Sequence, residues 1–245
     1  MAGAGQGPLI ATVDIGLLHG FAAGPFTWRE VVDRLATNHR VAVLDRPWAS
    51  LGEQVTATLD EIGRHGLDRP VLMGHSAGAE VAVATAVAAP DRVGALVLIG
   101  PVIGRGPPRL AVAAARLPGA GYIGPRLVRS GTRFLGPVLR SMWHDPRNVT
   151  SEVVEGYRRP LRQPGVAEAL WRMTGVAGRD SSLLEAAGGL EHPCLTLIGE
   201  GDRLAAPIAM PRNRTVWIAE CGHLPHEEQP ARVLAEVGAF LAQLP

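Results

Sequence analysis

The first hundred residues alternate short apolar runs with longer amphipathic segments. The apolar runs are predicted to be strands: 9–18, 40–44, 70–73 and 93–99. The segments between them are predicted to be helices: 25–37, 52–65 and 77–89. Strands that alternate with helices of about 10–15 residues form βαβ units with parallel strands. Because the apolar runs are nearly continuous, both faces of the sheet are expected to be covered. The pattern therefore predicts an α/β fold with a mostly parallel, doubly wound sheet.

The strand pattern stops after residue 101 and resumes near residue 193. The later elements are predicted to be two strands and a closing helix: 194–198, 215–219 and 230–244. Residues 102–187 contain no convincing strand, so we predict a helical cap there and a core domain made of residues 1–101 and 188–245. The cap segment holds 13 of the 24 arginines and has a net charge of +7, whereas the core has −6.

Composition excludes several classes of protein. The net charge of +1 gives no overall electrostatic footprint for nucleic acid. The two cysteines, Cys194 and Cys221, form neither a disulfide framework nor a metal-binding spacing, and we expect them to be reduced. Residues 1–8 lack the basic flank of a signal peptide, and no apolar run approaches the roughly 20 residues that span a bilayer. We expect a cytoplasmic protein without nucleic-acid or membrane partners; the absence of lysine is typical of a GC-rich bacterial genome.

The pentapeptide Gly74-His75-Ser76-Ala77-Gly78 follows a predicted strand and begins a predicted helix. In that context G-x-S-x-G forms a sharp strand-to-helix turn that exposes the serine hydroxyl above the sheet. The start of the following helix favours negative charge near that hydroxyl. Ser76 is therefore the candidate nucleophile.

A serine hydroxyl needs a base to remove its proton. His223 follows the last predicted strand and is the favoured candidate, and His226 three residues later is the alternative. His75 precedes the nucleophile, where its side chain would point away from Ser76, so we expect a structural role for it.

A carboxylate must orient the histidine and stabilise its cation. Asp202 lies in the loop after the strand at 194–198, and Glu200 is the rival acid in the same loop. The loop after the strand at 93–99 reads Gly100-Pro101 and offers no carboxylate. The order Ser76, Asp202, His223 favours Asp202.

Two backbone N–H groups are needed where negative charge develops on the reacting carbonyl. The amide of Ala77 directly follows the nucleophile. The second donor is expected from the loop after the first parallel strand, which reads His19-Gly20-Phe21, and the N–H of Phe21 is the candidate. His19 is expected to support this loop by hydrogen bonding.

Residues 9–100 and 193–244 resemble the α/β-hydrolase fold superfamily, with the insertion in the position of its cap. The matching motifs occur in the family order: HGF at 19–21, GHSAG at 74–78, GEGD at 199–202 and CGHLPHEEQP at 221–230. A serine nucleophile resembles the branch of esterases, lipases, type II thioesterases, carbon–carbon bond hydrolases and haloperoxidase-like esterases. Epoxide hydrolases and haloalkane dehalogenases have aspartate at that position.

Two departures from the family pattern concern loops. The family usually has D-x-P-G-x-G-x-S after the second parallel strand, whereas residues 45–50 read DRPWAS and lead directly into a helix. The shortened loop either leaves that side of the substrate pocket open or lets Trp48 fill it. The other candidates for the substrate pocket are His19, Gly20, Trp143 and Trp171, although the two cap tryptophans would equally well pack the cap onto the sheet. The N-terminal part is also short, which leaves little room for a leading antiparallel hairpin. The cap arginines either bind an anionic substrate or solvate the cap surface.

The resemblance and the three residues together imply a serine hydrolase that cleaves a carboxylic ester or thioester of a small molecule through an acyl-enzyme. No metal or organic cofactor is implied. The same residues also fit a carbon–carbon bond hydrolase or a lyase or cyclase step, and a non-catalytic ligand binder is a third hypothesis. The sequence does not indicate the substrate or the oligomeric state.

Overall fold

The computed structural model describes residues 12–106, 109–176 and 182–244. Its sheet has six strands in the order β2-β1-β3-β4-β5-β6, and every neighbouring pair is parallel. The strands are β1 (Asp14–Leu18), β2 (Arg40–Val43), β3 (Val71–His75), β4 (Ala95–Ile99), β5 (Cys194–Gly199) and β6 (Asn213–Ile218). The predicted parallel sheet is therefore confirmed, and the described residues add no antiparallel strand to it.

The register aligns the carboxyl ends of the central strands. Gly74 of β3 pairs with Leu18 of β1 and with Leu98 of β4, so β1, β3 and β4 end at the same edge. Gly199 at the end of β5 pairs with Ile218 at the end of β6. Ligand sites of open parallel sheets lie beyond this edge.

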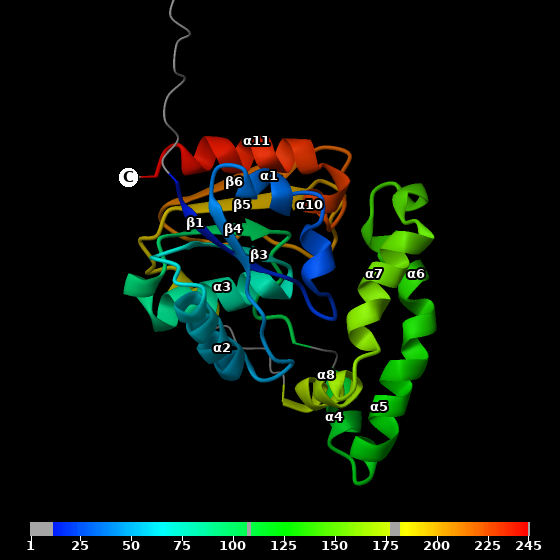
Figure 1. The fold of residues 1–245 in the computed structure, drawn as a ribbon. Coiled ribbons are helices and arrows are strands. Elements are labelled where there is room, and N and C mark those ends of the chain that lie inside the picture. Colours follow the sequence, from blue (N-terminus) through cyan, green and yellow to red (C-terminus); the bar gives the residue numbers. More distant parts are fainter. Residues whose placement is uncertain (1–11, 107–108, 177–181, 245) are drawn as a thin grey trace, which may run out of the picture.

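Helices cover both faces of the sheet. In Figure 1, α2 (Leu51–Arg64) and α3 (Ala77–Ala88) lie on one face, and α1 (Val32–Ala36) and α11 (Pro230–Leu241) lie on the other. A separate buried cluster packs under each pair of helices, one around Leu72 and the other around Met73. Successive side chains of a strand point to opposite faces, so the continuous apolar run of β3 supplies both clusters.

The insertion is helical and lies to one side of the core (Figure 1). Its helices are α4 (Arg109–Ala115), α5 (Ala120–Gly131), α6 (Leu135–Met142), α7 (Ser151–Leu161) and α8 (Val166–Val176), with short 3-10 turns at Thr132–Phe134 and Pro146–Asn148. The next helix, α9 (Ser182–Ala187), lies against α3, and its Ala187 is fully buried in the core cluster. The polypeptide therefore returns to the core before residue 188. Residues 107–108 and 177–181 of the predicted cap lie outside the described residues.

Two segments differ from their predicted bounds. Residues 25–37 form a 3-10 turn, Pro25–Trp28, and the short α1 instead of one helix, because Val31 leaves helical geometry at φ −125°. The predicted strand at 9–18 is β1 from Asp14 onward, and residues 9–11 lie outside the described residues. Two further short elements complete the core: the 3-10 turn Pro90–Arg92 and α10 (Pro225–Glu228).

No helix in the described ranges is long and apolar enough to cross a membrane. Cys194 and Cys221 are both buried and unpaired. Burial raises the pKa of the Cys194 thiol to about 12, so this side chain is an uncharged thiol near neutral pH.

Candidate active site

Ser76 occupies a sharp turn between β3 and α3. Its φ of +53° and ψ of −119° lie outside the regions that ordinary residues favour. The flanking glycines are required by space: a Cβ at Gly74 would overlap the backbone of Gly78, and a Cβ at Gly78 would overlap the carbonyl oxygen of Leu18. Ser76 N–H donates to the Ile99 carbonyl over 2.9 Å, which fixes the turn to the end of β4.

The three residues proposed for catalysis lie in one hydrogen-bonded line. Ser76 Oγ lies 3.0 Å from His223 Nε2, and His223 Nδ1 lies 2.8 Å from Asp202 Oδ2. The side chains of His223 and Asp202 are 2% and 0% exposed, so water competes little for these bonds. The Asp202 carboxylate accepts the Nδ1–H, which leaves the Nε2 lone pair directed at the serine hydroxyl.

Asp202 is held in the turn after β5. Its other oxygen, Oδ1, accepts the N–H groups of Leu204 at 2.8 Å and Ala205 at 3.1 Å. Burial alone would raise the pKa of this carboxyl, but the bond to His223 and the two N–H donors outweigh burial and hold the pKa below its usual range. The rival acid, Glu200, is exposed at the beginning of the same turn. Asp202 therefore stays ionised beside the histidine.

The loop that carries His223 is anchored to the cap. His223 N–H donates to the carbonyl of Met142, at the end of α6, over 2.7 Å. The Glu228 carboxylate accepts N–H groups from both sides of this contact: Gly222 at 3.0 Å, Leu224 at 3.1 Å and His144 at 2.7 Å. The backbone around the histidine is consequently fixed by the core and the cap together.

Two candidate N–H donors lie beside the serine. Ala77 begins α3, so its amide has no partner within the helix. Phe21 follows Gly20, where an added Cβ would lie 3.3 Å from Ser76 Cβ. Among the described residues, neither amide donates to another backbone carbonyl. Both N–H groups therefore stay candidates for binding a negatively charged oxygen of a ligand.

The other histidines near the site have structural contacts. His75 Nε2 lies 3.0 Å from the His223 carbonyl, and burial lowers the pKa of His75 to about 3. His226 is fully buried, contacts Thr27 Oγ1 at 2.9 Å, and has a pKa lowered well below its usual value by burial. His19 donates from Nδ1 to the Gly20 carbonyl at 3.0 Å, and burial lowers its pKa to about 4. His226, the alternative base, has its described contact with Thr27 and not with the serine.

A buried polar cluster next to the site was not predicted from the sequence. The Glu227 carboxylate accepts from Tyr157 of the cap, from Thr27 at 3.0 Å and from Arg29 at 2.5 Å. Burial raises the pKa of Glu227, although these partners oppose the shift. No sequence motif predicts a contact between α7 and α10. The available signal was the charged Glu227-Glu228 dipeptide within the histidine loop motif.

A cavity of about 600 Å³ opens at Ser76 and Ala77. Its remaining walls come from the loop after β1, the segment after β2, helices α2, α3, α8 and α9, and the segment after β4: Phe21, Arg46, Trp48, Ala49, Ser50, Leu51, Gln54, Glu80, Val81, Val102, Arg105, Gly106, Met173, Thr174 and Leu183. Phe21 and Trp48 meet edge to face with ring centroids 6.1 Å apart. Trp48, which belongs to the shortened loop, thus forms part of the cavity wall next to Phe21.

The structure separates the other predicted pocket residues from this cavity. His19 and Gly20 lie behind its wall, in contact with Trp48 and His75 respectively. Trp143 is 8% exposed and packs with Leu139 between the cap and the core, because its indole fills that junction. The Trp171 ring packs directly on Gly124 of α5, where the missing side chain makes room for it. Neither tryptophan lines the cavity.

No group of three or more His, Cys, Asp or Glu residues within the described ranges is placed to hold a metal ion. Ser76 brings a hydroxyl to the cavity beside the backbone amide of Ala77, and His223 and Asp202, hydrogen-bonded in line with Ser76, add an imidazole and a carboxylate. Together they can transfer a proton from a nucleophile and stabilise a negatively charged oxygen.

Comparisons with known proteins agree with this fold. A family model described as the alpha/beta hydrolase family matches residues 17–237. An uncharacterized hydrolase of Bacillus subtilis, YugF, is 23% identical over 250 residues, covering 91% of this chain and 88% of the relative.

Two solved structures show the same fold. An esterase from Thermogutta terrifontis is 24% identical, with a TM-score of 0.75 and coverage of 95% of this chain and 90% of that one. The 2-hydroxy-6-oxo-6-phenylhexa-2,4-dienoate hydrolase of a Rhodococcus strain is 22% identical, with a TM-score of 0.68 and coverage of 94% and 90%. Because the family model spans most of the sequence, the chain belongs to the alpha/beta hydrolase family.

Proposed function

We propose that the protein is a serine hydrolase that cleaves a carboxylic ester or thioester of a small molecule. The observation that supports this most directly is the hydrogen-bonded line from Ser76 Oγ through His223 to Asp202, with separations of 3.0 and 2.8 Å, at the cavity. A serine, an imidazole and a buried carboxylate in this order make an activated nucleophile.

In the proposed reaction Ser76 Oγ attacks the carbonyl carbon of the substrate while its proton passes to His223 Nε2. Asp202 holds the imidazole by Nδ1 and stabilises the cation that forms. The carbonyl oxygen becomes negatively charged and accepts N–H groups from Phe21 and Ala77. His223 then returns the proton to the leaving alcohol or thiol. Water, activated by the same histidine, releases the acid and restores the serine.

The test is covalent labelling with a fluorophosphonate probe, which reacts with activated serine hydroxyls. Wild type is expected to be labelled at Ser76, Ser76→Ala to remain unlabelled, and Asp202→Asn to react at least about a hundredfold more slowly because the histidine loses its orienting partner. The control is Ser130→Ala, which removes an exposed serine of α5. A folded wild type that is not labelled would contradict the proposal.

A second candidate is hydrolysis of a carbon–carbon bond by the same three residues. The structural similarity to the 2-hydroxy-6-oxo-6-phenylhexa-2,4-dienoate hydrolase favours this alternative. A series of p-nitrophenyl esters of increasing chain length separates the two. An esterase should show a clear optimum in acyl length, whereas a dedicated carbon–carbon hydrolase should label with fluorophosphonate yet turn over every ester slowly.

The proposal includes no metal or organic cofactor, because each step is assigned to a residue of the chain. We also propose a cytoplasmic location, supported by two buried cysteines that remain thiols.

A further inference from the structure

Arg46 is a buried guanidinium in the wall of the cavity that contains Ser76. It follows β2 at the carboxyl edge of the sheet and is only 6% exposed. Among the described residues no carboxylate lies within ion-pair distance of it; the charge of its exposed neighbour Asp45 favours the cation but does not outweigh burial. Burial without an acidic partner costs an ion several kcal/mol, so such a charge is rarely retained without a use.

The hydrogen bonds of Arg46 leave part of the guanidinium unused. One Nη group donates to the carbonyl of His19, and the other donates to Gln54 Oε1 over 2.5 Å. The Nε–H has no partner among the described residues. Since a guanidinium has five N–H donors, three remain without a described acceptor. Burial lowers the pKa of Arg46 to about 10, so the group is still charged at neutral pH.

The rest of the cavity wall is mainly apolar, and its apolar side chains are Phe21, Trp48, Leu51, Val81, Val102, Met173 and Leu183. Two other charged residues line it. Arg105 is exposed, and the Glu80 carboxylate accepts the Gly104 N–H over 2.8 Å. The cavity therefore combines a large apolar surface with one deeply enclosed cation.

We propose that Arg46 binds a carboxylate of the substrate, so that the preferred substrates are esters with an apolar acyl chain that ends in a carboxylate. Guanidinium groups match carboxylates in shape and charge, and the apolar wall would hold the chain between the carboxylate and the reacting carbonyl. This inference rests on the proposed serine hydrolase function. The competing explanation is that Arg46 only holds the His19 carbonyl and, through it, the loop of Phe21.

The experiment compares two esters of equal chain length, p-nitrophenyl hexanoate and the mono-p-nitrophenyl ester of adipic acid. In wild type the adipate ester is expected to have the higher kcat/KM. Arg46→Gln should lower kcat/KM for the adipate ester by about tenfold to a hundredfold, mainly through KM, because a charge-assisted bond is lost. The hexanoate ester should change by less than about threefold. Arg46→Lys should keep part of the preference, since it keeps the charge.

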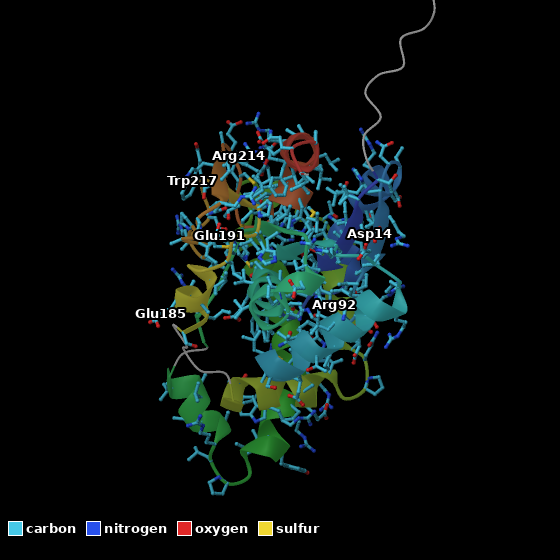
Figure 2. All side chains as sticks on the ribbon, turned by 90° about the vertical axis from the view of Figure 1, so that its left-hand side faces the viewer. Asp14, Arg92, Glu185, Glu191, Arg214 and Trp217 are labelled. Carbon is cyan, nitrogen blue, oxygen red and sulfur yellow. The ribbon has the colours of Figure 1, made fainter. Side chains whose placement is uncertain are left out.

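The matched control is Arg92→Gln. Arg92 is exposed and precedes β4, at the opposite end of the sheet from Ser76. Figure 2 views the molecule from the side away from the cap and shows Arg92 on the near face. Both esters should retain wild-type rates in this variant.

Three results would overturn the inference. If Arg46→Gln lowered kcat/KM equally for both esters, the role of Arg46 would be only to hold the loop of Phe21. If wild type showed no preference for the adipate ester, there would be no carboxylate binding to assign to Arg46. A preference abolished by Arg105→Gln but not by Arg46→Gln would place the carboxylate at the exposed arginine.

A binding measurement keeps the inference separate from the proposed function. Monomethyl adipate should raise the Tm of the Ser76→Ala variant and should not raise the Tm of the Ser76→Ala/Arg46→Gln double variant. This result does not depend on turnover, whereas failure of the proposed function appears as absent fluorophosphonate labelling. Equal Tm shifts in the two variants, or no shift in either, would contradict the role of Arg46.

Discussion

The sheet core and the cap differ in how completely their own apolar side chains are buried. In the core, large side chains such as Leu72, Leu98 and Leu195 are fully buried between the sheet and its helices. In the cap, small clusters pack against the core, while Leu127 and Val138 remain 59% and 50% exposed on its outer side. Close packing determines the positions of core atoms closely, whereas the cap is constrained mainly where it touches the core.

The proposed chemistry follows the same division. Ser76, Asp202 and His223 all belong to loops at the carboxyl edge of the core sheet. Near them the cap is hydrogen-bonded to the core: the Met142 carbonyl accepts His223 N–H, His144 N–H donates to Glu228, and the Tyr157 hydroxyl donates to Glu227. The core therefore carries the proposed catalytic residues, and the cap restrains their backbone from outside.

The largest expected effect is on the free energy of unfolding, when a glycine is replaced by alanine once in the core and once in the cap. Gly78→Ala puts a methyl group against the backbone carbonyls of Leu18 and His19, so we expect a loss of about 3 kcal/mol in unfolding free energy and little activity. Gly121→Ala lies in α5 with nothing near the new methyl group, and we expect a gain of about 1 kcal/mol. Denaturant unfolding measures both. Similar losses in the two variants would remove the contrast between core and cap.

A second test uses pH, because the buried histidines beside the core site are uncharged. His19 and His75 have pKa values lowered to about 4 and about 3 by burial, and burial also lowers the pKa of His226 well below its usual value. Below pH 6.5 the unfolded chain binds protons that the folded chain excludes, so stability falls as pH falls. Each histidine contributes a slope of about 1.4 kcal/mol per pH unit between its two pKa values.

Glu227 acts in the opposite direction, because its raised pKa lets the folded state keep a proton that the unfolded state releases. Glu227 can therefore offset the pH dependence caused by at most one of the three histidines. The unfolding free energy is therefore expected to decrease from pH 6.5 to pH 5. His226→Gln should reduce this slope, because it removes one of the buried uncharged histidines. A stability that is constant over this range would contradict burial of the neutral histidines.

The smallest expected effect concerns the contact between cap and core. Tyr157→Phe removes a donor to the buried Glu227 carboxylate, and we expect a loss of about 1–2 kcal/mol. Limited proteolysis should then cut the cap faster than in wild type. Tyr122→Phe is the matched control, since Tyr122 is 71% exposed on the same cap. Equal cleavage of both variants would show that the hydroxyl of Tyr157 does not hold the cap.

The sequence predicted the core sheet well, because its determinants are local. Continuous apolar runs mark strands buried on both faces, and Gly74 and Gly78 mark a turn whose geometry excludes side chains. Ser76, Asp202 and His223 were chosen because each follows a predicted strand and because their order matches that of the α/β-hydrolase family. These features depend on few distant contacts, so they are readable in one sequence.

The cap was less predictable for a physical reason. An aromatic residue in an amphipathic helix fits a pocket or a packing interface equally well, and only the fold decides which one it meets. Trp143 fills the junction between cap and core, Trp171 packs on Gly124, and Trp48 alone of the three lines the cavity. The cluster of Tyr157 with Glu227 and the enclosed Arg46 also depend on contacts between distant segments.

The bond between the Met142 carbonyl and His223 N–H has a consequence for how this enzyme can change. Every amino acid supplies a backbone carbonyl, so this restraint does not depend on which side chain occupies position 142. Cap side chains can therefore be exchanged while the main chain continues to hold the histidine in place. The fold thereby lets the cap surface diverge in sequence without loss of this restraint on His223.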